Sequence, residues 1–437
     1  MSSLATIAII FLAAIILIAI RLPIGLVLVT VAFFGVMWET SFEAALGLLA
    51  NQPYELATNW QFAAAPMFMF MGYVAARTGL TSGLFDASRV LLARVPGSLA
   101  VSSVMASGLF AAASGSSVAT SASMSRIAVP EMLKRGYDQG LACGSVGASG
   151  TLGSLIPPSL VLILFGIYAN VSIGQLFLAG FIPGILSALI YMAMIIVRVK
   201  LRPELAGTPV SQDEIKARSL GPALWAVLPL PILILLVMGS IATGFATPTE
   251  SGALGAGGAV LLSFINRTLT LRALREAFRE TAIAFGAIFF ILVGGGLLVR
   301  FVALSGISYD LLEFFAAIDG GPLALILLAA LVYLVLGMFV DPIGLMLLTI
   351  PIFLPLANTM DINLVWFGII IVKLLEIGLI TPPVGLNIYV IKSTLGNLVD
   401  IQRIFRGVTW FIAMDILTLA ILIAFPAITL WLPELMQ

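Results

Sequence analysis

The stretch SGSSVATSAS, residues 114–123, is a run of small and hydroxyl-bearing residues inside an otherwise apolar region of the chain. A short polar turn follows at 134–138, and the next apolar segment contains Ile-Pro-Pro-Ser at 156–159. Consecutive prolines cannot continue a helix, because the ring clashes with a preceding carbonyl group and the amide donor is missing. At membrane depth, broken backbone is tolerated only where it lines a cavity or is buried in protein. Freed carbonyl groups and hydroxyls at such breaks can hold a small cation, so this stretch predicts half of a binding site.

The composition is typical of a membrane protein. Of the 437 residues, 61% are hydrophobic and 10% are charged, whereas charged residues make up about a quarter of a soluble domain. Apolar runs of the length that crosses a bilayer, roughly 20 residues, recur from end to end. Histidine is absent and Cys143 is the single cysteine, which removes the usual catalytic base and any thiolate metal cluster. We predict an all-α polytopic membrane protein that is not an enzyme, needs no cofactor and binds neither a transition metal nor nucleic acid.

A basic loop divides the apolar spans into two halves. Residues 1–197 form the first half and 222–437 the second, and the linker 198–221 holds five of the 21 Lys and Arg residues. Basic loops stay in the cytoplasm. Five spans are expected before the linker, so both termini are predicted to lie on the opposite side of the membrane. Surface segments are expected at residues 77–95, 267–279 and 305–319, the second of them being a basic amphipathic arm before a span at 281–300.

Each half is expected to contain about five spans, one of them broken, and a re-entrant hairpin. The hairpins are predicted at about 97–130 and 322–357, and the broken helices at about 140–171 and 364–395. Gly115 precedes Pro157 by 42 positions, and Asp341 precedes Pro382 by 41. An odd number of spans inserts the halves from opposite sides, so the sequence predicts two inverted repeats. Paired interrupted segments in such repeats indicate a transport site near the membrane midplane.

Hydroxyl groups at the two expected helix breaks are candidate cation ligands. Seven hydroxyl residues lie between Ser114 and Ser125, which is more than close helix packing requires, although packing of small residues remains the alternative. Sodium prefers hard oxygen ligands, which hydroxyls and freed carbonyls supply. The first-half candidates are Ser114, Gly115, Ser116, Ser117 and Thr120. The second-half candidates are Thr381, Pro382, Gly385 and Asn387, with Asp341 either a helix cap or a site contact.

Charged residues within the spans have two interpretations each. Lys373 and Glu376 are three apart on one helix, so they either form a structural pair or belong to a functional site. Arg126 is placed to attract a substrate carboxylate, with cytoplasmic snorkelling as the alternative. Glu250 is either a helix cap or functional. Gly294–Gly296 is expected to permit close helix packing.

Several longer motifs carry a family resemblance. The segment SGSSVATSASMSRIAVPEMLKRGYDQG, followed by GTLGSLIPPS and SIGQLFLAGFIPG, resembles the large membrane subunit of tripartite ATP-independent periplasmic (TRAP) transporters. ATPTESGA, DPIGLMLLTIPIFLPL and GLITPPVGLNIYV are similar to motifs of the second half of that subunit. The similarity extends over nearly the whole chain in the same order. Val118 stands where the family pattern has proline, which alters the hairpin tip but removes no polar ligand.

The resemblance implies a secondary transporter in a bacterial inner membrane, with scaffold and transport domains that work as an elevator. It implies sodium coupling, a small four-helix membrane partner, and a periplasmic substrate-binding protein that delivers an organic acid such as a C4-dicarboxylate or sialic acid. Sodium would lie at each hairpin and its break, which adds Gly153 and Pro157 to the first set and keeps Asp341, Thr381, Pro382 and Gly385 in the second. The acid would lie between them, and its candidate contacts are Arg126, Ser159 and Asn387.

Functions of other classes fit the sequence less well. A stand-alone cation-coupled anion transporter with the same inverted repeats differs only in needing no binding protein, so the family motifs alone argue against it. An intramembrane enzyme would need a nucleophile with a base at usable spacing, and none is evident. An ion channel would not need two paired breaks. ATP-driven transport would require a separate ATPase chain, since the sequence contains no Walker loop.

Overall fold

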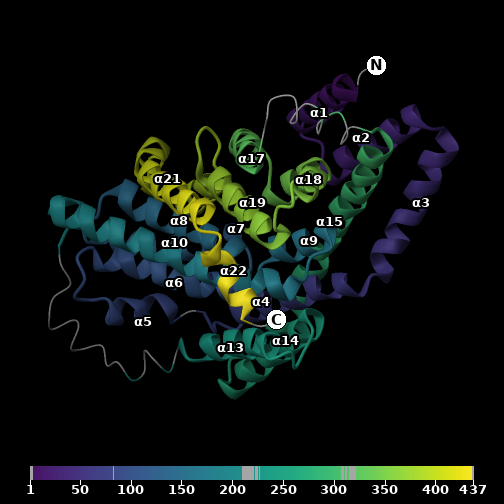
Figure 1. Ribbon diagram of the computed structural model, residues 1–437. Coiled ribbons are helices and arrows are strands. Elements are labelled where there is room, and N and C mark those ends of the chain that lie inside the picture. The colour runs from purple at the N-terminus through teal and green to yellow at the C-terminus, as the bar shows by residue number, and fades with distance from the viewer. Residues whose placement is uncertain are drawn as a thin grey trace.

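The computed structural model describes residues 3–81, 83–208, 221, 225, 227–306, 310, 313 and 321–435, and within these it is helical and contains no strand (Figure 1). The described part of the expected first half consists of α1 (Ser3–Ala19), α2 (Ile24–Glu39), α3 (Phe42–Thr58), η1 (Trp60–Ala63), α4 (Ala64–Arg77), α5 (Leu84–Leu91), α6 (Ser98–Ser114), α7 (Ser117–Lys134), α8 (Gln139–Leu155), α9 (Leu160–Ala169) and α10 (Ile173–Leu201). After η2 (Pro203–Ala206), the rest consists of α13 (Pro229–Ala242), α14 (Pro248–Ile265), α15 (Leu271–Leu304), α17 (Pro322–Gly337), α18 (Pro342–Thr359), α19 (Leu364–Ile380), α20 (Leu386–Leu395), η3 (Gly396–Leu398), α21 (Ile401–Ala424) and α22 (Ala427–Glu434).

Five helices of the described part are long and apolar enough to cross a membrane. They are Gln139–Ala169 counted across its break, Ile173–Leu201, Leu271–Leu304, Pro342–Thr359 and Ile401–Ala424. Four shorter apolar helices, Ile24–Glu39, Ser98–Ser114, Pro229–Ala242 and Pro322–Gly337, accompany them. The all-α membrane architecture predicted from composition is therefore confirmed.

The two halves repeat one order of elements. In the first half, the hairpin α6–α7 is followed by α8 and α9, which are separated at 156–159, and then by the long helix α10. In the second half, the hairpin α17–α18 is followed by α19 and α20, separated at 381–385, and then by α21. The predicted repeat is thus present as matching hairpins and broken helices.

Side-chain caps set where these helices begin. Ser116 begins α7 by accepting a bond from the backbone N–H of Ala119 at 3.4 Å. Asp138 and Asp341 begin α8 and α18 in the same way. Such caps satisfy backbone donors that the first turn of a helix leaves free.

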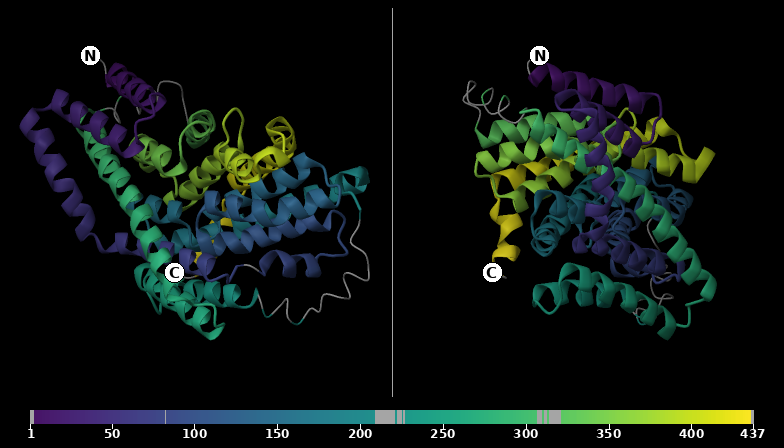
Figure 2. Two further views of the ribbon diagram at one scale, coloured as in Figure 1. Left: turned by 180° about the vertical axis from the view of Figure 1, so that it is seen from behind. Right: turned by 90° about the vertical axis from the view of Figure 1, so that its right-hand side faces the viewer.

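The first limbs of the two broken helices form the centre of the molecule. Every residue from Gly140 to Leu155 and from Val365 to Ile380 is buried. Helices that are buried on all sides form the interior of a bundle, and α8 and α19 each pack against several other helices of the bundle, which Figure 2 shows from behind and from the side. Their neighbours include α6, α7 and α21 for α8, and α17, α10 and α21 for α19.

A second group of helices packs pairwise around this centre. The closest pairs are α2 with α15 and α4 with α14. A Cβ at Gly294 of α15 would lie 2.6 Å from Leu28 Cβ and 2.9 Å from the Val29 nitrogen of α2, so only glycine allows this approach. The expected packing role of Gly294–Gly296 is therefore observed. The helix α3 stands apart at the edge of the molecule and is tied to α15 by an ion pair between Glu55 and Arg300 (Figure 1).

Two of the expected surface segments differ from the structure. In residues 77–95, only Leu84–Leu91 form a separate helix, because α4 continues to Arg77 and the chain turns before α5. The basic arm expected at 267–279 is helical from Leu271 onward, and it continues into the span at 281–300 as one helix, α15, because no glycine or proline interrupts the boundary between them. Most of the segment 305–319 and residues 209–220 of the linker lie outside the described residues.

Candidate functional site

The turn between α6 and α7 brings the predicted hydroxyl ligands together. Gly115 adopts a left-handed conformation with φ of 58°, which ends α6 and reverses the chain. The hydroxyl oxygens of Ser114 and Thr120 lie 2.9 Å apart, and the Thr120 hydroxyl donates to the Ser116 carbonyl at 2.8 Å. Three oxygen atoms of the hairpin tip thus converge, which is the kind of cluster that a small hard cation requires.

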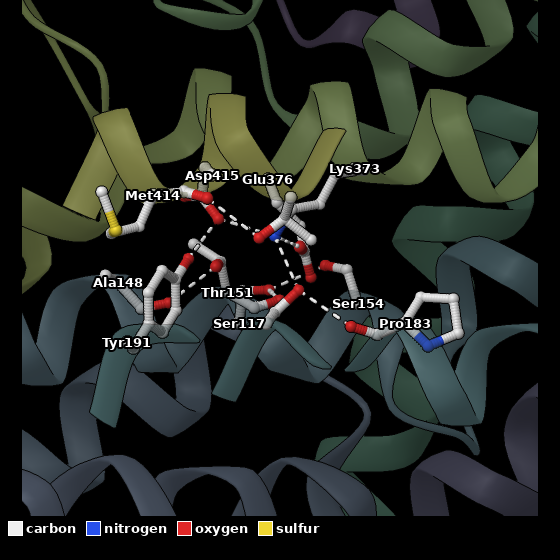
Figure 3. Close-up of polar contacts among 12 residues, drawn as sticks. Ser117, Ala148, Thr151, Ser154, Pro183, Tyr191, Lys373, Glu376, Met414 and Asp415 are labelled. Carbon is white, nitrogen blue, oxygen red and sulfur yellow. Dashed lines mark hydrogen bonds and ion pairs between the residues drawn. The ribbon is translucent and has the colours of Figure 1, made fainter. Parts of the chain in front are cut away.

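The hairpin tip rests directly on the first helix break. A Cβ added at Gly115 would lie 2.8 Å from the Pro158 carbonyl oxygen, and one added at Gly153 would lie 3.0 Å from the Ser116 carbonyl carbon. Ser117 extends the contact, since its hydroxyl lies 2.7 Å from that of Ser154 and donates to the Thr151 carbonyl at 3.3 Å. Figure 3 shows these side chains pointing toward one another between α7 and α8. The structure therefore joins the first-hairpin candidates to the break beside Gly153 and Pro157.

A cavity of about 360 Å³ opens beside this tip. From hairpin α6–α7 it is lined by Phe110, Ser114, Ser116, Ala119 and Ser123, and from the facing helices α4 and α15 by residues that include Tyr73 and Glu280. Leu160, which follows the first break, and Ile343, at the start of α18, also line it. The cavity thus lies where both hairpins and the first break meet the helix pair α4 and α15.

An ion-pair network fixes the carboxylate that faces the cavity. Glu280 accepts from both the Nε and the Nη2 of Arg77, the former at 3.2 Å. Arg77 Nη1 lies 3.4 Å from Glu276, one turn earlier on α15. The carboxylate charge next to the cavity is consequently neutralised by Arg77 of the neighbouring helix α4.

The second-half candidates are less closely gathered. Thr381 donates to the Ile377 carbonyl at 2.6 Å, and Gly385 has a φ of 57°, so both shape the break after α19. Asp341 accepts from the Gly344 backbone at 3.0 Å, which gives it the capping role that was one of its two interpretations. None of these residues, nor Pro382, lines the cavity beside hairpin α6–α7.

The three acid-contact candidates also lie outside the lining of that cavity. Ser159 is fully buried, donates to the Ser154 carbonyl and caps α9. Asn387 is fully buried and donates to the Gly147 carbonyl at 3.5 Å, linking α20 to α8. Arg126 is exposed on α7. It lies three residues beyond Ser123, so helical geometry places it one turn further along the face that lines the cavity.

The structure shows which contacts the charged residues of the apolar helices make. Lys373 and Glu376 form an ion pair of 3.1 Å. Glu250 completes a capping box with Thr247 at the start of α14, which is the structural interpretation of that carboxylate. Asp415, 2.6 Å from Lys373, is a third charged member that sequence reasoning missed.

Sequence reasoning also missed the carboxylates of α15 near the cavity, Glu276 and Glu280. Glu276 and Glu280 are four apart on one helical face, a spacing that allows both to meet the same cation. That spacing was the available signal, but it does not identify Arg77 as the partner, which lies 203 positions earlier.

Comparison with known proteins places this geometry in context. Residues 11–428 match the family described as the DctM component of the tripartite ATP-independent periplasmic transporter. The chain is 32% identical over 415 residues to the sialic acid TRAP transporter large permease protein SiaM of Vibrio cholerae, covering 95% of each chain. It is 32% identical over 389 residues to the C4-dicarboxylate TRAP transporter large permease protein DctM of Pseudomonas aeruginosa, covering 88% of this chain and 89% of that one. Its fold is similar to the crystal structure of the Alcanivorax borkumensis YdaH transporter, with a TM-score of 0.57 at 14% identity over 90% of this chain and 89% of that one.

Proposed function

Because the chain belongs to the DctM family of tripartite ATP-independent periplasmic transporter components, we propose that it is the large membrane subunit of a sodium-coupled organic-acid importer. A periplasmic substrate-binding protein delivers the acid, and a small four-helix membrane subunit completes the complex in the bacterial inner membrane. Both termini face the periplasm. Relatives are named for sialic acid, C4-dicarboxylate and ectoine transport, and the substrate proposed for this chain is a small carboxylate of the first two kinds.

The cavity beside hairpin α6–α7 is the observation that carries this proposal. It is large enough for a small organic acid and is lined by the hydroxyls of Ser114, Ser116 and Ser123. Hydroxyls bind carboxylates without supplying a fixed charge, and the one carboxylate in the lining, Glu280, is neutralised by Arg77. Arg126 lies one turn away on the same face of α7 and supplies the positive charge that attracts the acid.

Sodium is proposed to bind where each hairpin meets its break. At the first hairpin, Ser114, Thr120 and the Ser116 carbonyl already converge to within hydrogen-bond distance of each other. Gly115, Ser117 and Gly153 are proposed to hold this tip against α8 and the break, to which Pro157 belongs. Asp341, Thr381, Pro382 and Gly385 are proposed to do the same in the second half.

Movement of one block past the other would expose the cavity alternately to the two sides. We assign the hairpins, the broken helices and the long helices after them to the transport block, with the repeats bounded at residues 1–197 and 222–437 and the linker at 198–221. The pairs α2 with α15 and α4 with α14 form the scaffold. Ser159 and Asn387 are buried against α8 in the described state, so the acid reaches them only when the breaks move apart.

The test is uptake of labelled acid into proteoliposomes that contain this chain and its small partner. An inward sodium gradient is imposed, with and without the cognate binding protein outside. Uptake that requires both supports the proposal. Uptake with sodium alone would favour a stand-alone carrier, and uptake driven by a proton gradient alone would overturn the sodium assignment.

Replacement of the hairpin hydroxyls locates the ion. Ser114→Ala and Thr120→Val are expected to raise the sodium concentration for half-maximal uptake. The matched control is Ser240→Ala, which breaks a comparable hydroxyl pair with Ser251 at 2.9 Å, between α13 and α14. Wild-type sodium dependence in both hairpin variants would remove the first sodium site from this hairpin.

A further inference from the structure

A fully buried charged cluster lies behind the hairpin site, between α10, α19 and α21. Lys373 of α19 lies 3.1 Å from Glu376 Oε2 and 2.6 Å from Asp415 Oδ1, and its third bond goes to the Ser187 hydroxyl at 3.2 Å. Tyr191 donates its phenolic hydrogen to the same Asp415 oxygen. Lys373, Glu376 and Asp415 all have no exposed surface. Figure 3 shows the side chains converging from three helices.

The charges of this cluster do not balance when every group is ionised. One ammonium faces two carboxylates, which leaves one negative charge in a site without solvent access. A buried charge without a counter-charge costs several kcal/mol, and proteins neutralise it by pairing or by a proton. The cluster therefore requires one further positive charge.

The hydrogen bonds show which carboxylate would take a proton. Asp415 Oδ1 accepts from both Lys373 and Tyr191, so this oxygen already has two donors. Glu376 accepts at Oε2 from Lys373 alone, and its Oε1 is buried without a hydrogen-bond partner. Asp415 Oδ2 is the other acidic oxygen of the cluster that lacks a partner. A proton on Glu376 makes the cluster neutral and turns an unpaired acceptor into a donor.

The neighbouring helices supply no other countercharge. The helices α8 and α18, which also pack against α19, contain no charged residue. The remaining titratable groups on packed elements are engaged elsewhere or exposed. Tyr168 of α9 bonds to Leu292, Tyr333 of α17 to Thr349, and Lys392 of α20 to Gly396 and Val399. Arg198 of α10 lies over the Trp410 ring, and the exposed groups are Lys200 of α10, Arg403 and Arg406 of α21, Tyr389 of α20 and Glu434 of α22. Within the described residues, no group of three acidic, histidine or cysteine side chains could hold a metal ion.

The cluster is also connected to the hairpin site. The Thr151 hydroxyl donates to the Ala148 carbonyl at 2.7 Å and lies next to Tyr191, and the Thr151 carbonyl accepts from Ser117 at 3.3 Å. A single residue of α8 thus separates the charged cluster from the tip of hairpin α6–α7 (Figure 3).

We propose that the Lys373–Glu376–Asp415 cluster is a proton-binding site, in which one proton resides on Glu376 at neutral pH. The proton keeps the centre of the molecule neutral, and Thr151 and Tyr191 connect it to the hairpin. The assignment is independent of the proposed sodium coupling, because it rests on the charges and hydrogen bonds of the cluster alone.

Infrared spectroscopy of the purified complex in lipid nanodiscs tests the site directly. A protonated carboxylic acid has a C=O stretching band that a carboxylate lacks, and this band is expected in the wild type at neutral pH. Glu376→Gln is expected to remove it. Glu250→Gln, which changes an exposed carboxylate at the start of α14, is the matched control and leaves the band unchanged.

Thermal unfolding provides a second readout that needs neither substrate nor gradient. Glutamine imitates the protonated acid, so Glu376→Gln is expected to unfold at neutral pH at the same temperature as the wild type. The folded protein holds a proton that an exposed glutamate has already lost at neutral pH. Wild-type stability therefore falls as the pH rises toward release of that proton, and the fall is smaller in the variant.

Three results would overturn the proposal. The first is an infrared band that is absent or unchanged in Glu376→Gln. The second is a loss of neutral-pH stability in Glu376→Gln as large as that of Lys373→Met, which would show an ionised pair. The third is a stabilisation by sodium that disappears only in Glu376→Gln, which would make a metal ion the countercharge. A failed uptake assay would leave all three measurements interpretable, since none depends on transport.

Discussion

Replacing Gly153 with alanine tests whether seating of the hairpin tip on the first break governs sodium binding. The added Cβ would lie 3.0 Å from the Ser116 carbonyl carbon and 3.2 Å from the Ser116 oxygen and the Ser117 nitrogen. These are backbone atoms, which cannot rotate away, so the tip has to shift by a few tenths of an ångström. Overpacking of this kind costs about 1–3 kcal/mol, against a helix-propensity gain of about 1 kcal/mol for replacing glycine.

The expected consequence is a larger effect on binding than on folding. In the Gly153→Ala variant without sodium, the hairpin tip is expected to move away from α8 and so to relieve the overpacking. The proposed sodium ion requires the tip to lie against α8, so binding of the ion restores the overpacking and is weakened by its cost. A coupling of about 1–3 kcal/mol corresponds to a loss of sodium affinity of about 5- to 150-fold. The measurements are the sodium concentration for half-maximal uptake and the sodium-dependent rise in unfolding temperature. Gly257→Ala in α14 is the control, because a Cβ there meets nothing within 4 Å. Equal sodium affinity in the two variants would refute the reasoning.

Three further predictions concern the charged contacts. Lys373→Met leaves the buried Asp415 carboxylate without its cation and is expected to lower the unfolding free energy by about 3–5 kcal/mol; Asp415→Asn in the same chain should restore part of the loss in a denaturant titration. Tyr191→Phe removes a bond to a charged acceptor and should cost about 1.5–3 kcal/mol by the same measurement, whereas an unchanged midpoint would show that the bond contributes nothing. Arg77→Ala leaves the Glu280 charge beside the cavity, so the acid concentration for half-maximal uptake should rise about fivefold, as expected for about 1 kcal/mol of repulsion in water; failure of Glu280→Gln to reverse the rise would exclude this cause.

Local chemistry explains what could be predicted from the sequence. Pro-Pro pairs break helices and Gly115 reverses the chain through its own backbone, so hairpins, breaks and repeat were all visible without a structure. Close helix packing at Gly294–Gly296 was likewise expected from the residue type alone, although α2 as the partner was not.

Contacts between residues far apart in the sequence explain which features could not be predicted. Asp415 stands in an apolar helix with no charged neighbour within eight positions, and Tyr191, its partner, is 224 positions away. The Glu280 carboxylate that lines the cavity is paired with Arg77, and the two residues meet only because α4 packs against α15. Continuity of α15 also escaped prediction, because a change from polar to apolar residues along one helix resembles a boundary between two.

The interleaving of the two halves has a consequence for synthesis of the protein. The helix α2 finds its main partner in α15, and α8 is covered by α21 and α20, so the first half leaves the ribosome before the helices that complete it exist. Chains made from the N-terminus ordinarily fold domain by domain. In this protein the first helices to be made reach their final packing only after the last helices have been made. A nascent chain released before Ile401 would lack the α21 cover of α8 and the Asp415 partner of Lys373. Such a fragment therefore keeps a face of α8 and a buried lysine uncovered, so the core of the first half is complete only when the last long helix has been made.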